Sequence, residues 1–191
     1  MWLGYRQGWG WLDGVDSSTL NALHDFGVTH PWWVQFWEVF CVIFGPGAFR
    51  LFGVVAIVVA LKARQLRTAL FLLFSVELGG VVTVMAKGLA DRPRPSGALV
   101  FAPSSAFPSG HAVAVMVGVL ALLTVTAPLL SGRMRRAALI AGALIVIAIG
   151  FRRVALNVHH PSDVLAGWAL GYLYFFVCLR IFRPPSLTAS K

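Results

Sequence analysis

Residues 111–130 read HAVAVMVGVLALLTVTAPLL, a stretch in which no acidic or basic side chain follows the first histidine. A helix needs about 20 predominantly apolar residues to cross a bilayer, and this stretch reaches that length. It ends at Ser131-Gly132-Arg133, where polar residues resume. We therefore expect a transmembrane helix here and a membrane protein around it.

The composition of the whole chain agrees with this expectation. The 191 residues are 58% hydrophobic and 12% charged, whereas average soluble domains are about 45–50% apolar and about 25% charged. The chain is too apolar to be disordered and too poor in charge to be an ordinary soluble enzyme. Its length accommodates one domain, a compact bundle of spans.

Four further stretches are apolar enough to form helices of the bundle, and basic residues follow or flank each of them. They are Gly45–Leu61, Thr68–Ala86, Ala137–Phe151 and Ser162–Phe182. The expected fold is an all-α integral membrane bundle of five or six transmembrane helices.

The segment Pro31–Phe44 has two interpretations, a sixth span that is tilted or a helix lying in the interface. It is short for a span, and it carries three tryptophans together with Glu38. Clustered tryptophan is typical of the headgroup zone and favours the interfacial helix. The chain then divides into an N-terminal interfacial segment at 1–44, a membrane-embedded domain at 45–183 and a cytoplasmic tail at 184–191.

The positive charge of the chain carries information about orientation. There are 16 Lys and Arg residues against 7 Asp and Glu, a net charge of +9. In a soluble protein this excess would suggest nucleic acid, but the apolar background favours topology signals or an anionic membrane substrate instead. The connections at 62–67 and 131–136 and the tail are basic, so all three are expected in the cytoplasm. The loops at 87–110 and 152–161 then lie on the outer face.

These two outer loops also contain basic residues, which the positive-inside rule does not explain. Lys87, Arg94 and Arg153 supply positive charge, and the planar fork of arginine suits phosphate oxygens. Ser109 and Gly110 stand where a helix begins, so their backbone N–H groups and the helix dipole favour an anion. The pattern predicts an anion site at the membrane surface.

Two histidines and one carboxylate accompany these cations. His111 and His159 can transfer protons, or attack directly when they are neutral. Asp163 lies four residues after His159, and Pro161 between them suits the first turn of a new helix. Asp163 is therefore expected to reach back to the imidazole and fix its tautomer.

The same residues resemble the three motifs of the type 2 phosphatidic acid phosphatase superfamily. The first motif, Lys then six residues then Arg-Pro, matches Lys87 through Arg94-Pro95, and the second matches Pro108-Ser109-Gly110-His111 letter for letter. The third is Ser-Arg, five residues, His, three residues and Asp. It matches Arg153, His159 and Asp163, except that Arg152 replaces the serine. The resemblance covers roughly Gly45 to Phe182.

The resemblance implies a role for each matched residue. His159 is the expected nucleophile that forms a phosphohistidine, Asp163 orients it, and His111 protonates the departing group. The residues expected to hold the phosphoryl oxygens are Lys87, Arg94, Ser109, Gly110 and Arg153. Neither a metal ion nor another cofactor is implied, because cations of the protein take that role.

The implied substrate is a phosphomonoester or diphosphate of a lipid, presented by the bilayer itself. A polyprenyl diphosphate is favoured over phosphatidylglycerophosphate and phosphatidic acid, since the site is expected to face outward. A non-enzymatic anion or lipid transporter is the alternative from another class. Nucleic acid is not an expected partner, and the oligomeric state stays open. The roles of two further residues stay open as well. Arg92 either contacts the phosphate or faces solvent, and His160, next to the expected nucleophile, either contacts the substrate or does not.

Overall fold

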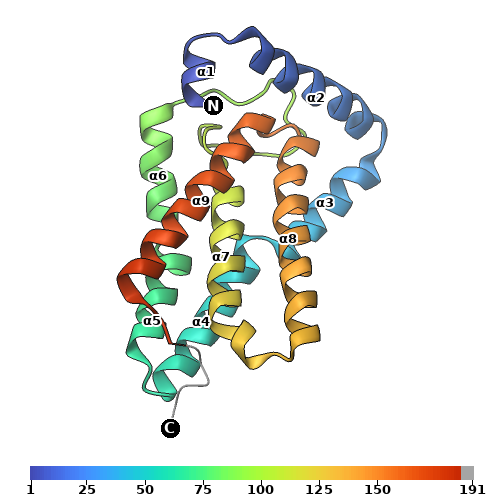
Figure 1. The fold of residues 1–191 in the computed structure, drawn as a ribbon. Helices are drawn as coiled ribbons and strands as arrows, with labels where there is room; N and C mark the ends of the chain where they lie inside the picture. Colours follow the sequence, from blue (N-terminus) through green and yellow to red (C-terminus); the bar gives the residue numbers. More distant parts are fainter. Residues whose placement is uncertain (186–191) are drawn as a thin grey trace.

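The computed structural model describes residues 1–185, and every regular element in that range is a helix (Figure 1). The prediction of a cytoplasmic tail falls largely on residues 186–191, which lie outside the described range. In chain order the helices are α1 Trp2–Arg6, α2 Gly10–Thr29, α3 Pro31–Phe44, α4 Pro46–Lys62, α5 Leu66–Leu72, η1 Leu73–Glu77 (a π-helical turn), α6 Gly79–Ala90, α7 Gly110–Thr126, η2 Ala127–Leu129 (a 3₁₀ turn), α8 Gly132–Ala155 and α9 Pro161–Phe182.

Five helical segments of the described chain are long and apolar enough to cross a membrane. They are Pro31–Lys62, Leu66–Ala90, Gly110–Leu129, Gly132–Ala155 and Pro161–Phe182. Three of the five combine neighbouring elements, because α3 continues into α4, α5 continues through η1 into α6, and α7 ends in η2. The count agrees with the five-span form of the predicted bundle.

The segment Pro31–Phe44 is helical, as both interpretations of the sequence require. It forms α3, which joins α4 at a bend. Gly45 makes the bend in extended conformation, and a Cβ there would lie 2.1 Å from the carbonyl oxygen of Cys41. Trp33 and Trp37 pack against Phe151, with ring centroids 6.3 and 5.4 Å apart, whereas Trp32 is exposed. The predicted boundary at residue 44 therefore falls inside a candidate span.

Helix α7 occupies the centre of the bundle, between α4, α8 and α9 (Figure 1). Glycines of neighbouring helices allow this close packing: a Cβ at Gly167 would lie 2.7 Å from the Ser109 carbonyl oxygen, and one at Gly171 would lie 2.9 Å from that of Val113. Small residues at helix contacts let backbones approach inside a membrane, where apolar side chains gain little by leaving lipid. This packing fixes the ends of α7 and α9 against each other.

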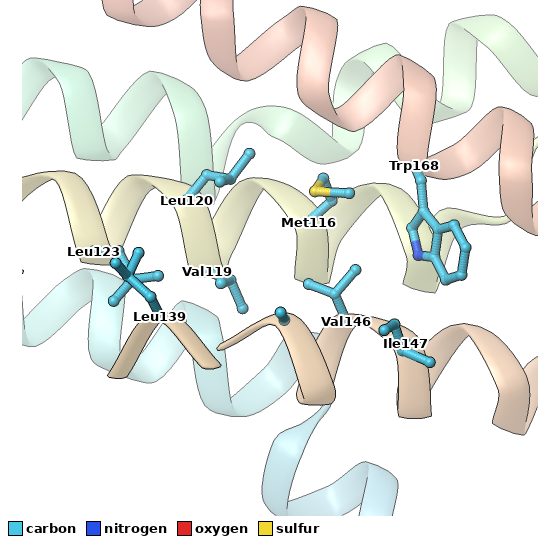
Figure 2. Close-up of a pocket in the computed structure, with 9 residues that line it drawn as sticks. Met116, Val119, Leu120, Leu123, Leu139, Val146, Ile147 and Trp168 are labelled. Atoms are coloured by element: carbon cyan, nitrogen blue, oxygen red, sulfur yellow. The ribbon is translucent and has the colours of Figure 1, made fainter. Parts of the chain in front are cut away.

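An apolar crevice of about 320 Å³ lies between α7, α8 and α9, with Trp168 at one end (Figure 2). Its other lining residues are Met116, Val119, Leu120, Leu123, Leu139, Ala143, Val146 and Ile147. None of these side chains is ionisable, so the crevice is suited to apolar contact and offers no group for phosphate chemistry.

Helices α1 and α2 cross one end of the bundle, and the two basic connections lie at the opposite end (Figure 1). These connections are at 62–67, between α4 and α5, and at 131–136, before and within α8. In α2, Leu12 and Leu20 are buried, and Leu20 packs with Val154 of α8 and Val164 of α9. The bundle therefore has a basic end and a covered end.

Candidate active site

The covered end brings together four helix termini: the last turns of α6 and α8 and the first turns of α7 and α9 (Figure 1). A cavity of about 210 Å³ opens there. Its polar lining comes from Lys87, Arg94, Ser104, Gly110, His111, Arg153 and His159, and residues 101–103 complete the wall. Of the eight residues predicted for the site, six line this cavity. The other two, Ser109 and Asp163, are fully buried behind it.

His159 is the most enclosed side chain of the cavity, at 1% exposure. A tight turn after α8 delivers it, because the N–H groups of Val158 and His159 both donate to the Arg153 carbonyl oxygen at 3.2 and 3.1 Å. Its Nε2 lies 3.3 Å from Arg94 Nη1 at the cavity, and its Nδ1 lies 3.6 Å from Asp163 Oδ2. The predicted approach of Asp163 to the imidazole is therefore present, at a separation slightly longer than a hydrogen bond.

Burial determines the charge of this imidazole. It lowers the pKa of His159 from its usual value near 6.5 to about 4, and the nearby Asp163 opposes this shift only in part. At neutral pH the ring is uncharged. A neutral imidazole whose Nδ1–H points to a carboxylate carries its lone pair on Nε2, which faces the cavity within hydrogen-bond reach of Arg94 Nη1.

This pKa leads to a testable pH profile. Only a neutral imidazole can attack, so the nucleophile role that the resemblance implies for His159 predicts activity that persists as pH falls through 6.5 and declines about tenfold per unit below pH 4. The measurement is kcat/KM for a lipid phosphomonoester from pH 3.5 to 8, corrected for the second ionisation of the phosphate near pH 6. A corrected midpoint near 6.5 would contradict the assignment.

Asp163 occupies the first turn of α9, and both of its oxygens accept hydrogen bonds. Oδ1 accepts from Arg92 Nη1 at 2.7 Å, and Oδ2 accepts from the His160 backbone N–H at 2.8 Å. The His160 ring is also close, with Nδ1 3.1 Å from Oδ2. Pro161 begins the helix and needs no hydrogen-bond partner for its nitrogen. His160 is therefore a capping residue of α9 and a neighbour of the carboxylate.

The three cations of the cavity bind no carboxylate. Among the described residues, Lys87, Arg94 and Arg153 form no ion pair. Instead, Lys87 donates to the Ser105 carbonyl oxygen, and Arg94 donates to the carbonyl oxygens of Ser104 and Val158 at 2.6 and 2.5 Å. Burial lowers the pKa of Arg94, but from so high a value that it stays charged. Three cations without a counter-ion make an anion site.

The first turn of α7 adds neutral donors to this anion site. Ser109 is the N-cap, and its N–H donates to the Asp163 carbonyl oxygen at 3.0 Å. Its hydroxyl oxygen is buried without a hydrogen-bond partner among the described residues. The N–H groups at the start of a helix have no partner within the helix, and the helix dipole favours negative charge there. Gly110 places this helix start at the cavity wall.

Arg152, which replaces the serine of the third motif, does not line the cavity. It is buried, and its Nε donates to the Trp37 carbonyl oxygen at 2.8 Å. The contact ties α8 to α3. The substitution therefore adds a packing contact between two spans.

Asp16 escaped the prediction from sequence, and Arg92 was left open between phosphate contact and solvent. Arg92 is 3% exposed and binds Asp163 and Asp16, so it belongs neither to solvent nor to the phosphate cavity. Asp16 lies on α2 between the buried Leu12 and Leu20, four residues from each. An acidic residue on the apolar face of a helix is the signal in the sequence that could have revealed Asp16. Such a residue is expected to be buried, and a buried carboxylate needs a partner.

Comparison with known proteins decides the family. The model of the PAP2 superfamily matches residues 68–185 of this chain. The chain belongs to the PAP2 superfamily. This is the family that the three motifs resembled, and its membership confirms that assignment.

Several curated relatives of this PAP2 chain are similar over different lengths. Phosphatidylglycerophosphatase B of Bacillus subtilis (strain 168) is 33% identical over 155 residues, which is 79% of this chain and 70% of that protein. Undecaprenyl-diphosphatase of Sulfolobus acidocaldarius is 36% identical over 75 residues, 39% of this chain and 32% of that protein. Lipid A 1-phosphatase of Rhizobium johnstonii is 34% identical over 123 residues, 59% of this chain and 47% of that protein.

A solved structure has the same fold. It is a crystal structure of a transmembrane PAP2-type phosphatidylglycerolphosphate phosphatase from Bacillus subtilis, with a TM-score of 0.74 and 24% identity over 89% of this chain and 87% of that one. The all-α membrane fold is thus confirmed, and the PAP2 chain is a multi-pass membrane protein. Its expected class, a lipid phosphatase that hydrolyses phosphoric ester bonds, is confirmed by the family and its relatives. The transporter alternative has no support from them.

Proposed function

We propose that His159 attacks the phosphorus atom of a lipid phosphate and forms a phosphohistidine. The observation that carries the proposal is a neutral, buried imidazole whose Nε2 faces a cavity lined by Lys87, Arg94 and Arg153. These cations compensate the charge on the phosphoryl oxygens, which is the main requirement of phosphoryl transfer. The N–H group of Gly110 at the start of α7 binds the same oxygens, whereas that of Ser109 already donates to the Asp163 carbonyl oxygen.

The reaction proceeds in two displacements. First, the Nε2 lone pair forms the N–P bond while the bond from phosphorus to the lipid oxygen breaks, and His111 donates the proton that this oxygen takes up. Asp163 stabilises the positive charge that develops on the His159 ring. Next, His111 accepts a proton from water, whose oxygen attacks phosphorus, and the N–P bond breaks to release inorganic phosphate. His111 lines the same cavity as His159, as this exchange requires.

We propose phosphatidylglycerophosphate as the lipid. The support is the relative from Bacillus subtilis named phosphatidylglycerophosphatase B, which matches 79% of this chain. The polyprenyl diphosphate expected from the sequence is the second candidate, supported by the shorter match to an undecaprenyl-diphosphatase. Phosphatidic acid is the third, since its phosphomonoester offers the same three terminal oxygens to the cations.

A substrate panel tests both levels of this proposal. The purified protein in detergent micelles, with EDTA present, is given phosphatidylglycerophosphate, a polyprenyl diphosphate and phosphatidic acid, and released phosphate is measured. We expect release from all three, with kcat/KM highest for phosphatidylglycerophosphate. Higher kcat/KM for the polyprenyl diphosphate would replace the proposed lipid, and no release from any substrate would overturn the function.

We also propose that the active site faces the outside of the cell membrane. The support is the separation of charges along the bundle: the connections at 62–67 and 131–136 lie at the end opposite the site (Figure 1), and such basic connections favour the cytoplasm.

An impermeant thiol reagent tests this orientation in intact cells. Ala98 is exposed in the loop of the covered end, whereas a side chain at the neighbouring Gly97 would be strained at φ +87°. In a chain whose two cysteines are replaced by serine, we expect Ala98→Cys to be labelled from outside. Met134→Cys, on the opposite end, serves as the control and should be labelled only after lysis. The reverse pattern would overturn the orientation.

A further inference from the structure

A buried polar network joins α2 to the first turn of α9 behind the cavity. It consists of Asp16, Arg92, Ser162 and Asp163, whose exposures are 2%, 3%, 1% and 0%. Charged groups are costly to bury unless they pair with one another. The arrangement of these four side chains is therefore tightly constrained.

One guanidinium connects the two carboxylates of this network. Arg92 Nη2 donates to Asp16 Oδ2 at 3.0 Å, while Arg92 Nη1 donates to Asp163 Oδ1 at 2.7 Å. The Tyr5 ring of α1 lies 4.5 Å from the Arg92 guanidinium carbon and covers it. The planar fork of arginine holds both acids at fixed angles, which a lysine ammonium would not do.

Ser162 closes the network on its other side. Its backbone N–H donates to Asp16 Oδ1 at 3.1 Å, and its hydroxyl donates to Asp16 Oδ2 at 2.5 Å. The same hydroxyl oxygen accepts from Arg92 Nη1 at 2.7 Å. Asp16 thus holds both Arg92 and the residue that precedes Asp163.

The network determines which oxygen of Asp163 faces the nucleophile. Arg92 engages Oδ1, so Oδ2 is the oxygen that lies 3.6 Å from His159 Nδ1. Without Arg92 the carboxylate could rotate toward the His160 N–H and ring, which already contact Oδ2. The angle of the carboxylate, and with it the orientation of His159, therefore depends on Arg92 and on the acid that fixes Arg92.

We propose that Asp16 and Arg92 are positioning residues of the phosphatase reaction, acting on His159 through Asp163. The inference rests on the proposed role of His159 as nucleophile. It assigns a part of the catalytic apparatus to α2, which lies outside the residues 68–185 that match the family model. Neither residue lines the phosphate cavity, so neither is expected to bind substrate.

The test is Asp16→Asn, with Asp13→Asn as the matched control. The asparagine side chain has the same shape as that of aspartate, and its oxygen still accepts from the Ser162 N–H. Its NH₂ group, however, is a donor that faces the donor Arg92 Nη2, so the hydrogen bond to Arg92 is lost. Asp13 is exposed one turn earlier on the same helix, and among the described residues it has no hydrogen bond or ion pair with the network, so its substitution removes the same charge and leaves those contacts in place. For Asp16→Asn we expect kcat to fall about tenfold or more, while KM and the inhibition constant of inorganic phosphate stay within twofold. Asp13→Asn should match the unmodified protein.

A second measurement does not depend on turnover. Diethylpyrocarbonate modifies neutral imidazoles, and mass spectrometry reports the rate at each histidine of the purified protein. We expect the rate at His159 to change at least threefold in Asp16→Asn and in Arg92→Lys, with the rate at His24 on α2 unchanged. A purely structural defect would instead alter the phosphate inhibition constant and the rates at several histidines together.

The outcomes separate the two proposals. If the unmodified protein releases phosphate and Asp16→Asn equals it in kcat and in the His159 rate, the positioning role is overturned and the phosphatase proposal stands. If the unmodified protein releases no phosphate, the proposed function fails, and the His159 rate alone decides whether α2 positions this imidazole. A raised phosphate inhibition constant in Asp16→Asn would also overturn the positioning role.

Discussion

Replacing His159 with alanine is expected to lower kcat by about 10⁴-fold or more, because a nucleophile has no substitute in a two-step displacement. The side chain is 1% exposed, and its Nε2 faces the cavity beside Arg94. Phosphate release from phosphatidylglycerophosphate micelles measures the loss. His24→Ala, which removes an imidazole from α2 outside the cavity, should leave kcat unchanged.

The same variant tests the covalent intermediate. With a ³²P-labelled lipid phosphate and rapid quenching in base, the unmodified protein should carry label that is stable to base and lost in acid, as expected of a phosphohistidine. His159→Ala should carry none. Label retained in His159→Ala, or turnover within tenfold of the unmodified protein, would exclude His159 as the nucleophile.

Replacing Arg153 with methionine is expected to abolish activity without loss of stability, and even with a gain. Arg153 is 5% exposed, forms no ion pair with the described residues, and has a buried Nε without a hydrogen-bond partner. A buried charge without an ion pair is unfavourable, so we expect this guanidinium to lower the stability of the protein and to be useful only when a phosphoryl group is bound. We expect kcat/KM to fall about 10³-fold, with the melting temperature in detergent unchanged or raised.

Arg152→Met provides the matched comparison, since the two arginines are adjacent and equally buried. Arg152 donates to the Trp37 carbonyl oxygen and lies outside the cavity. We expect a lower melting temperature and less than about a tenfold loss of kcat/KM, because a buried hydrogen bond is lost rather than a phosphate contact. A strong loss of stability in Arg153→Met would show that this residue is structural.

Sequence was sufficient to predict the parts of this protein that depend on local pattern. A span such as α7 is visible because its apolar residues are contiguous, and the site residues are visible because each motif is a short run with fixed spacing. His159 and Asp163 meet because four residues and a proline place them across one helix start. Such relations need no knowledge of distant contacts.

The parts that escaped prediction depend on contacts between distant segments. Asp16 and Arg92 pair across 76 positions, and no local spacing marks them as partners. Trp33 and Trp37 of α3 pack beside Phe151, a contact that no local pattern of the sequence marks. Helix α8 starts at Gly132, ahead of the predicted Ala137. Ser131 caps this start, because its hydroxyl accepts from the Met134 N–H at 3.5 Å, and the helix therefore includes the basic residues that precede Ala137.

The carbonyl groups that hold Lys87 and Arg94 have a consequence for selectivity. These cations have acceptors within the protein, at Ser104, Ser105 and Val158. An incoming headgroup therefore competes with the protein's own backbone carbonyl groups for these cations. Its binding is favoured only by the difference in strength between the hydrogen bonds that it accepts and those that the carbonyl groups accept. A neutral ester or hydroxyl oxygen is no better than a carbonyl, whereas hydrogen bonds to an ionised oxygen are about twice as strong. The carbonyl groups of Ser104, Ser105 and Val158 thus act as internal competitors that an uncharged headgroup does not displace and a phosphoryl group does.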